Sequence, residues 1–368
     1  MSDPSLKLVL MGTGPFAVPS FRRIAQSRHA IVSVVTKPPV EKPTRDKETL
    51  ESPVMSWARQ EGLPVATPLS INDPSSIQWL GELNADLLIV CDYGQILSNE
   101  ALSKARLGGI NLHGSLLPRH RGAAPVQWSI LAGDTDAGVS VIHMTPKLDA
   151  GPVLEQRASP IGAQENAQEL EVRLSQLGIE PTLLAIDALA RESSGTIDRV
   201  VGIPQDRELT TKAPRLKKTD GQLDFRYPLS WIDRQIRGLQ PWPGVYGNLV
   251  NAQGKSAQGK SVRVVIHKAH RMEIASGELV EYGLTPGQLV FSDIATKLSI
   301  AIEQPKHWVA VVAKDGLLVL EMVQVAGKLP MSSAGFVSGY GKQAGLHFET
   351  PSEPHPLLEK MMASSPDK

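Results

Sequence analysis

Residues 7–144 alternate between short apolar runs and longer segments with apolar residues at helical spacing, and this alternation limits the folds open to the chain. The short runs predict β-strands, and the segments between them predict α-helices. Strands that alternate with helices indicate an α/β fold with a doubly wound, mostly parallel sheet. In such a sheet the ligand binds at the carboxyl ends of the strands. The predicted strands are 7–11, 31–36, 63–66, 85–91, 109–113 and 138–144, and the predicted helices end at Ile24 or cover 53–61, 75–83, 97–104 and 123–131.

The pattern changes in the second half of the chain. Residues 165–190 have helical spacing, with a break expected near Gly178 or Pro181, and a stretch rich in Gly, Pro and basic residues follows. Beyond it, short β-rich segments between Gly turns predict a small β-barrel of the OB-like type. The predicted strands of this barrel are 245–250, 262–267, 288–291, 298–302 and 317–325. The predicted division is a first domain over 1–195, a linker over 196–220, a C-terminal barrel over 221–350 and a tail over 351–368.

Composition excludes several classes of protein. Lys and Arg balance Asp and Glu at 38 each, so the net charge gives no sign of a nucleic-acid partner. The single cysteine, Cys91, excludes a disulfide framework and a thiolate metal cluster. No apolar run reaches the roughly 18–20 residues that span a bilayer, and the N-terminus lacks the pattern of a signal peptide. We therefore expect a cytoplasmic monomer with no membrane partner and no metal.

The densest group of chemically versatile residues follows the predicted strand 109–113. Asn111 and His113 are two positions apart, so their side chains leave the same face of that strand near its carboxyl end. An Asn amide can donate to a carbonyl oxygen that gains negative charge, and a protonated His can stabilise the same charge and relay a proton. Acyl transfer to an amine needs both a donor to the oxyanion and a relay for the proton. The alternative is that Asn111 caps a turn and His113 is a satisfied surface histidine.

A third candidate residue, Asp149, lies in a Gly/Pro turn after the predicted strand 138–144. Its carboxylate could orient the His113 ring, favour the protonated imidazole, and hold a water that collects the proton of an amine. Because both residues follow strands, we expect them at the same edge of the sheet. Stabilisation of the turn alone is the other interpretation.

Taken together, these motifs resemble the folate-dependent formyltransferases. The matching positions are Asn111-x-His113, Ser115-Leu116-Leu117-Pro118, Arg121-Gly122 and Leu148-Asp149-x-Gly151-Pro152. The resemblance implies that Asn111, His113 and Asp149 carry formyl transfer, with 10-formyltetrahydrofolate as the formyl donor. It also implies a tetrahydrofolate site formed by two stretches, which are Ser115, Leu116, Leu117 and Pro118, and Gly94, Gln95, Ile96 and Leu97.

The family members that act on methionyl-tRNA are similar to the chain nearly end to end. Further similar positions include Phe16-Ala17-Val18-Pro19 and Pro241-Trp242-Pro243-Gly244. This resemblance implies formyl transfer to the amino group of initiator methionyl-tRNA, in support of translation initiation, with a barrel domain that helps hold the tRNA. Basic residues of the loop 37–52 and of the linker are the predicted tRNA contacts, with a solvated surface charge as the alternative for each alone: Arg45, Lys42, Lys47, Lys212, Arg215, Lys217 and Lys218.

Other functions remain as alternatives. One keeps the same three residues but transfers formyl to a small amine such as a nucleotide sugar. Another is a catalytically inactive module that binds folate or RNA. The run Gly12-x-Gly14-x-x-Ala17 mimics a dinucleotide-binding turn, but no acidic residue ends the second predicted strand. A metal site is not indicated, because His113, His120 and His143 lack the spacing of metal ligands.

Two positions near these motifs depart from the family pattern. Asp92 stands where a small uncharged residue is usual, directly before Tyr93-Gly94. Lys147 stands where a glycine is common, two positions before Asp149. Both residues lie beside the predicted folate-binding and catalytic residues. They therefore affect the details of folate binding that the resemblance implies.

Overall fold

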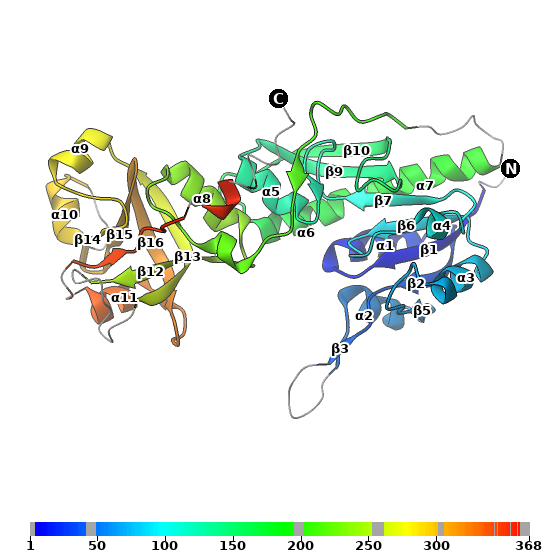
Figure 1. Cartoon of the computed structure of the whole chain (residues 1–368), viewed down its shortest axis with the longest axis horizontal. Coiled ribbons are helices and arrows are strands. Elements are labelled where there is room, and N and C mark those ends of the chain that lie inside the picture. Colours follow the sequence, from blue (N-terminus) through cyan, green and yellow to red (C-terminus); the bar gives the residue numbers. More distant parts are fainter. Residues whose placement is uncertain are drawn as a thin grey trace.

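The computed structural model describes residues 4–41, 49–194, 202–251, 261–300, 305–341, 343, 345–353, 355–358 and 360. Within these residues the chain forms an N-terminal α/β part and a C-terminal β part, placed end to end (Figure 1). Helices α5 (Pro125–Ala132) and α8 (Leu229–Gly238) lie where the two parts meet. None of the described helices is both long and apolar enough to cross a bilayer.

The N-terminal part is built on one seven-stranded sheet. Its strands are β1 (Lys7–Gly12), β2 (Ala30–Val35), β5 (Val65–Ala66), β6 (Leu87–Cys91), β7 (Gly109–His113), β9 (Asp136–His143) and β10 (Val153–Pro160). Their order in the sheet is β10-β9-β7-β6-β1-β2-β5. Neighbours from β7 to β5 are parallel, which confirms the predicted mostly parallel α/β sheet.

The edge of this sheet differs from the prediction. Strand β9 is antiparallel to β7, and β10, which the sequence did not predict, is antiparallel to β9. The apolar run of β10 is interrupted by Glu155, Gln156 and Arg157, as befits an edge strand with one solvated face. Strand β9 therefore ends beside the start of β7, and the loop 144–152 must return across the sheet.

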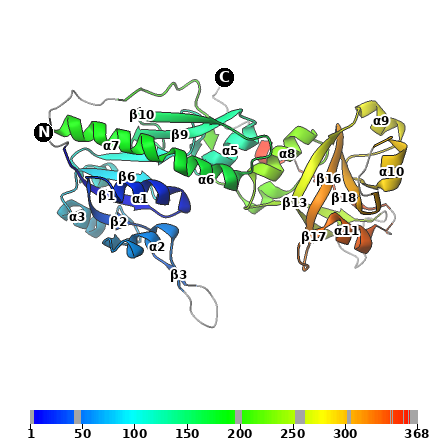
Figure 2. The ribbon, with the colours of Figure 1, turned by 180° about the vertical axis from the view of Figure 1, so that it is seen from behind.

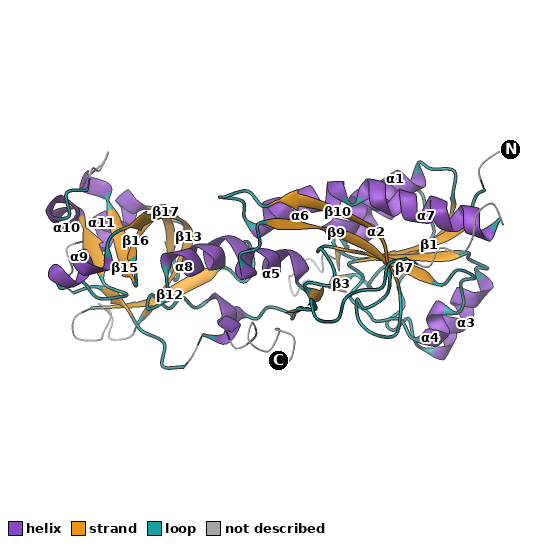
Figure 3. Cartoon of the chain, turned by 90° about the horizontal axis from the view of Figure 1, so that it is seen from above, coloured by secondary structure: helices purple, strands orange, loops and turns teal. Residues whose placement is uncertain are grey.

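Helices cover both faces of the sheet because its central strands are apolar on both sides, as in the fully buried β6. Figures 2 and 3 show α1 (Val18–Ala25), α6 (Ala167–Leu177) and α7 (Ile179–Ser193) on one face, and Figure 3 shows α3 (Pro74–Glu82) and α4 (Asn99–Leu102) on the other. The predicted helix break is confirmed at Gly178, where a Cβ atom would lie 2.8 Å from a methyl carbon of Leu112. Helix α2 (Pro53–Gln60) follows the two-stranded hairpin of β3 (Val40–Glu41) and β4 (Thr49–Leu50).

The C-terminal part is a small antiparallel sheet that closes almost completely on itself, which confirms the predicted barrel. Its strands are β12 (Val245–Val250), β13 (Val262–Glu273), β14 (Leu289–Phe291), β15 (Val309–Ala313), β16 (Gly316–Val325), β17 (Met331–Ser332) and β18 (His347–Phe348). The order is β14-β15-β16-β13-β12-β18, with β17 beside β16. Two backbone hydrogen bonds close the barrel. The Leu289 N–H donates to the Leu346 carbonyl at 3.0 Å, and the Phe348 N–H donates to the Gly287 carbonyl at 2.8 Å.

Three helices and three strands of the barrel were not predicted, and the strand predicted at 298–302 is wrong where the structure describes it, at residues 298–300. The missed elements are α9 (Ser276–Glu281), α10 (Ser292–Lys297), α11 (Ser333–Tyr340), β15, β17 and β18. In place of a strand at 298–302, the chain leaves α10 through Ser299, whose φ is +54°, and residues 301–304 lie outside the described part. The alternation of Leu298, Ser299 and Ile300 imitates a strand, but the preceding helix turn determines the local backbone.

The two parts share one apolar core at their junction. Trp128 of α5 is buried there with Ile232 and Ile236 of α8, in the same cluster as the inner face of the barrel. The Trp128 indole N–H donates to the Pro214 carbonyl at 2.9 Å, and Arg237 of α8 donates to the Glu165 carbonyl at 3.0 Å. The boundaries predicted at residues 195, 220 and 350 stay a prediction.

The segment predicted as a linker packs along the N-terminal part. Strand β11 (Lys212–Ala213) pairs with β8 (Arg121–Gly122), which directly follows the residues of the predicted site. A Cβ atom at Gly122 would lie 2.5 Å from the Ala213 carbonyl oxygen, so only glycine allows this approach. The contact ties residues 202–215 to the predicted catalytic loops.

Candidate active site

A cavity of about 510 Å³ lies at the carboxyl ends of β1, β6 and β7. Its walls come from the turn after β1, the loop after β6, the end of β7, the start of α5 and the loop 144–152. This is the edge at which parallel sheets bind ligands. Asn111, His113 and Asp149 all line it.

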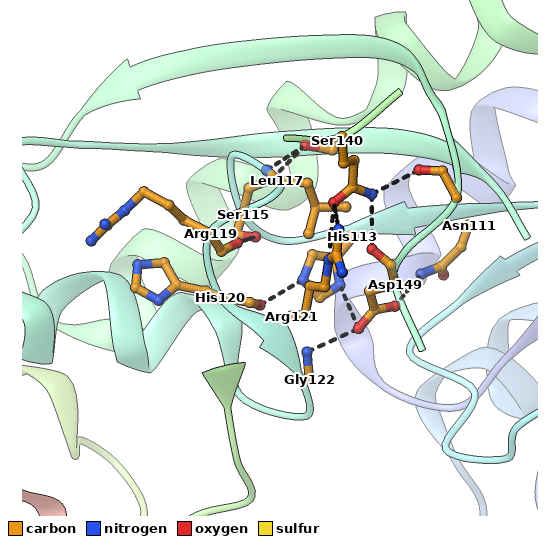
Figure 4. A network of polar contacts seen from close by, with 12 residues as sticks. Asn111, His113, Ser115, Leu117, Arg119, His120, Arg121, Gly122, Ser140 and Asp149 are labelled. Atoms are coloured by element: carbon orange, nitrogen blue, oxygen red, sulfur yellow. Dashed lines mark hydrogen bonds and ion pairs between the residues drawn. The ribbon is translucent and has the colours of Figure 1, made fainter. Parts of the chain in front are cut away.

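The side chains of these three predicted residues point toward one another (Figure 4). The Asn111 amide donates to Asp149 Oδ1 at 3.4 Å, and His113 Nδ1 lies 3.8 Å from Asp149 Oδ2. Only 6% of the His113 side chain and 8% of the Asp149 side chain are exposed, so bulk water screens their charges weakly. The Gly122 N–H donates to Asp149 Oδ2 at 2.9 Å and satisfies a further carboxylate lone pair.

Asp149 reaches this place differently from the sequence-based expectation. Because β9 is antiparallel to β7, the end of β9 lies at the opposite edge of the sheet from His113. The loop 144–152 crosses back and delivers Asp149, whose φ is +50°, a left-handed conformation uncommon outside glycine and Asn or Asp. The two residues do lie at the same edge of the sheet, as expected, but Asp149 reaches it through the returning loop and not directly from the end of β9.

Gln205 holds the returning loop in place, and sequence analysis did not identify this residue. Its side-chain amide donates to the carbonyls of Asp149 at 2.9 Å and Gly151 at 2.7 Å. Its amide oxygen accepts from Nε and Nη2 of Arg121, at 3.0 and 2.6 Å. Gln205 belongs to no regular element, and it lies 56 positions from Asp149, so no periodic pattern connects the two.

The protonation pattern of the His113 ring follows from its partner. His113 Nε2 lies 2.9 Å from the backbone carbonyl oxygen of His120. A carbonyl oxygen can only accept, so Nε2 carries a hydrogen. Nδ1 is then the nitrogen that faces Asp149 and can gain or lose a proton during a reaction.

Only one of the two stretches predicted to hold tetrahydrofolate lines the cavity. Gly94, Gln95, Ile96 and Leu97 all line the cavity, with Leu97 buried and Ile96 61% exposed. The Gln95 amide oxygen accepts from the Ile71 N–H at 2.8 Å, which fixes this loop against its neighbour. Such a wall of backbone and aliphatic groups suits a flat, partly polar ring.

The second predicted stretch does not border the cavity: Ser115, Leu116, Leu117 and Pro118. Ser115 is fully buried, and its carbonyl accepts from the Ser140 hydroxyl at 2.7 Å. The Leu117 N–H donates to the same hydroxyl at 3.0 Å. This stretch fastens the loop after β7 to β9, so the geometry favours a structural role over the predicted folate contact.

Of the predicted tRNA-binding residues, Arg215 alone among those described lines the cavity. Lys212, Lys217 and Lys218 are exposed along the same segment. The other three, Lys42, Arg45 and Lys47, lie outside the described residues. No group of three or more His, Cys, Asp or Glu within the described part of the chain could hold a metal ion.

The departure at Asp92 creates a charged group on the cavity wall with Lys37 and Glu171. Asp92 lines the cavity and is exposed to it, although the surrounding protein atoms withhold part of its hydration. Burial raises the pKa of the Asp92 carboxyl to about 6, although Lys37 acts in the opposite direction. Burial and the nearby Asp92 charge also raise the pKa of Glu171. Above pH 6 this wall therefore carries the Asp92 carboxylate, a charged form that the fold disfavours.

Replacing Asp92 by asparagine should stabilise the protein at pH 8 and leave its stability unchanged at pH 4. The folded-state pKa of about 6 lies above the ordinary value of 3.8, so the carboxyl costs stability as pH rises through this window. With allowance for solvent in the cavity, we expect a gain of about 1 kcal/mol at pH 8. Thermal unfolding of both proteins at the two pH values measures it. Equal gains at both would show that charge is not the cause.

Two family models match the chain. The model described as formyl transferase covers residues 6–186, and the model described as formyl transferase, C-terminal domain, covers residues 215–341. With the parallel sheet, the Asn–His–Asp site and the barrel in place, the chain belongs to the formyl transferase family.

Similar proteins indicate to which formyl transferases the chain belongs. A methionyl-tRNA formyltransferase of Rhodopirellula baltica is 43% identical over 95% of this chain and 98% of its own. Another of Citrifermentans bemidjiense is 36% identical over 92% of this chain and 95% of its own. Within the formyl transferases, the chain therefore belongs to the methionyl-tRNA formyltransferase family.

Solved structures with the same fold are more distant. A sugar 3N-formyl transferase, WlaRD, crystallised with dTDP and 5-N-formyl-THF, has a TM-score of 0.57 at 16% identity and covers 88% of this chain and 99% of its own. The N-formyltransferase of Helicobacter canadensis has a TM-score of 0.56 at 15% identity, with 86% and 98% covered. These similarities concern the fold alone.

Proposed function

We propose that this chain transfers the formyl group of 10-formyltetrahydrofolate to the amino group of initiator methionyl-tRNA and so supports translation initiation. The observation that carries the proposal is the meeting of Asn111, His113 and Asp149 in one cavity. Membership of the methionyl-tRNA formyltransferase family supports the acceptor, since the similarity includes the C-terminal barrel.

The three residues supply what formyl transfer requires. The amine nitrogen adds to the formyl carbon, and the carbonyl electrons move onto the oxygen. The Asn111 amide and a protonated Nδ1 of His113 can both donate to that oxyanion. The Asp149 carboxylate takes the proton that the amine nitrogen loses. The bond from the formyl carbon to the folate nitrogen then breaks, and the proton on His113 Nδ1 moves to that nitrogen. The proton that Asp149 took from the amine passes to His113 Nδ1, 3.8 Å away, which restores both side chains.

We further propose that the loop from Gly94 to Leu97 holds the folate ring, since all four of its residues line the cavity. Arg215 and Lys147 border the same cavity and can neutralise phosphates near the 3′ end of a tRNA. Lys212, Lys217 and Lys218 extend this positive charge along the exposed segment. We propose a cytoplasmic monomer, with the basic loop residues Lys42, Arg45 and Lys47 as further tRNA contacts.

Radiolabelled formyl transfer with purified protein tests the proposal. We expect label on methionyl-tRNA, with none on amino sugars linked to a nucleotide, the alternative acceptor. The KM for tRNA should rise steeply with salt, because phosphate contacts release counterions. Label on small amines with none on tRNA would overturn the proposed acceptor.

Replacing Gln205 by leucine should lower kcat about 10- to 100-fold and leave the KM values nearly unchanged, because small displacements of a reacting group have effects of this size. Leucine keeps the volume but loses both bonds to the Asp149 loop. Steady-state kinetics of formyl transfer measure the effect. Glu208→Gln, an exposed change in the same segment, is the matched control and should keep the original kcat. An unchanged kcat in Gln205→Leu would contradict this role.

A further inference from the structure

A second histidine, His120, lies beside His113, with its backbone carbonyl toward the His113 ring (Figure 4). It is 3% exposed and has a left-handed backbone, with φ at +61°. Its carbonyl oxygen is the acceptor for His113 Nε2 at 2.9 Å. Its ring is bonded elsewhere, with Nε2 2.6 Å from Asp134 Oδ2. The residue therefore connects the proposed catalytic imidazole to a carboxylate outside the cavity.

The carboxylate partner of His120 is ionised. Burial alone would favour neutral Asp134, but the hydrogen bonds and charges of His120 and Arg119 outweigh burial and lower the pKa of Asp134. Arg119 Nη2 lies 2.5 Å from Asp134 Oδ1. Because a carboxylate only accepts, His120 Nε2 carries the hydrogen of its bond to Asp134.

The backbone of His120 is held on its other side by Thr211 of the segment before β11. The His120 N–H donates to the Thr211 hydroxyl oxygen at 2.9 Å, and that hydroxyl lies 3.4 Å from His120 Nδ1. A left-handed conformation costs a residue other than glycine of order 1 kcal/mol or more. The bonds to Asp134 and Thr211 offset this cost and aim the carbonyl at His113.

We propose that His120, through its bond to Asp134, is a positioning residue that fixes the tautomer and orientation of the His113 imidazole. The inference rests on the proposed role of His113 in formyl transfer. Without the fixed carbonyl, His113 Nε2 loses its acceptor, and the hydrogen of the neutral ring can move to Nδ1. The protonation state of Nδ1, the nitrogen that faces Asp149, would then no longer be defined.

Substitutions can break the hydrogen bond between His120 and Asp134 without leaving a void in a tightly packed core. His120 and Asp134 border a separate polar cavity of about 330 Å³, into which water can enter when a side chain is shortened. His120→Gly keeps a residue that adopts the left-handed backbone at little cost and removes only the ring. Asp134→Ala keeps the ring and removes its acceptor.

The test combines nitrogen-15 NMR of the histidine rings with the kinetics of formyl transfer. The original protein should show His113, assigned by the signals lost in His113→Gln, as a single Nε2–H tautomer. In Asp134→Ala and His120→Gly we expect averaged tautomers of His113, a 10- to 100-fold lower kcat and KM values within about threefold. Arg119→Gln is the matched control, because this 44% exposed side chain is the other partner of Asp134, and it should change neither signal nor kcat.

The outcomes of these measurements decide whether His120 positions His113. An unchanged His113 spectrum in both variants overturns the proposal, even if kcat falls through loss of stability. Averaged tautomers with a lowered kcat support it. If the original protein transfers no formyl group, the proposed function fails, and the NMR comparison still decides whether His120 positions His113.

Discussion

Replacing His113 by alanine should lower kcat for formyl transfer by about 10²- to 10⁴-fold, because one side chain supplies both a donor to the oxyanion and a proton for the leaving nitrogen. The KM values should change little, since the His113 side chain is only 6% exposed and so offers little surface to a bound substrate. Single-turnover transfer of labelled formyl to methionyl-tRNA isolates the chemical step. Asn111→Ala, which removes one donor, should lower the rate about 10²- to 10³-fold.

The matched control for this prediction is a histidine far from the cavity. His270 lies on β13 of the barrel, where Nδ1 is 2.9 Å from Glu321. His270→Ala should keep the original kcat at saturating substrates. A rate for His113→Ala within tenfold of the original would show that another group carries the proton.

Local patterns in the sequence predicted the parts of the site that depend on a single element. The two-residue period of a strand placed Asn111 and His113 on one face, and both line the cavity at the end of β7. The apolar run ending at Cys91 predicted a fully buried strand, and β6 is one. Such features depend on neighbouring residues, so alternation and composition are sufficient to predict them.

The parts that the sequence missed depend on contacts between distant residues. Gln205 holds the Asp149 loop from 56 positions away, and Thr211 holds His120 from 91 positions away. Each of these polar residues looks like an ordinary loop residue, and only the fold gives it a partner. The direction of β9 was missed for the same reason, because strand pairing at a sheet edge is a tertiary choice.

The junction between the two parts has the largest consequence for stability, and Trp128→Ala should reveal it. The side chain is 2% exposed, and its N–H is bonded to the Pro214 carbonyl at 2.9 Å. Its loss should destabilise the protein by about 3–5 kcal/mol through lost burial, a cavity and an unpaired carbonyl. The midpoint temperature of thermal unfolding should fall by about 10 °C, as expected for a protein of this size.

Trp242→Ala is the matched control, because this indole is 50% exposed and its loss should cost less than about 1 kcal/mol. The core around Trp128 joins α5, which begins beside the cavity, to α8 and the barrel. The barrel should therefore melt together with the α/β part in the original protein and separately from it in Trp128→Ala. Calorimetry distinguishes one transition from two, and a single transition in Trp128→Ala would mean that the two parts stay coupled without this side chain.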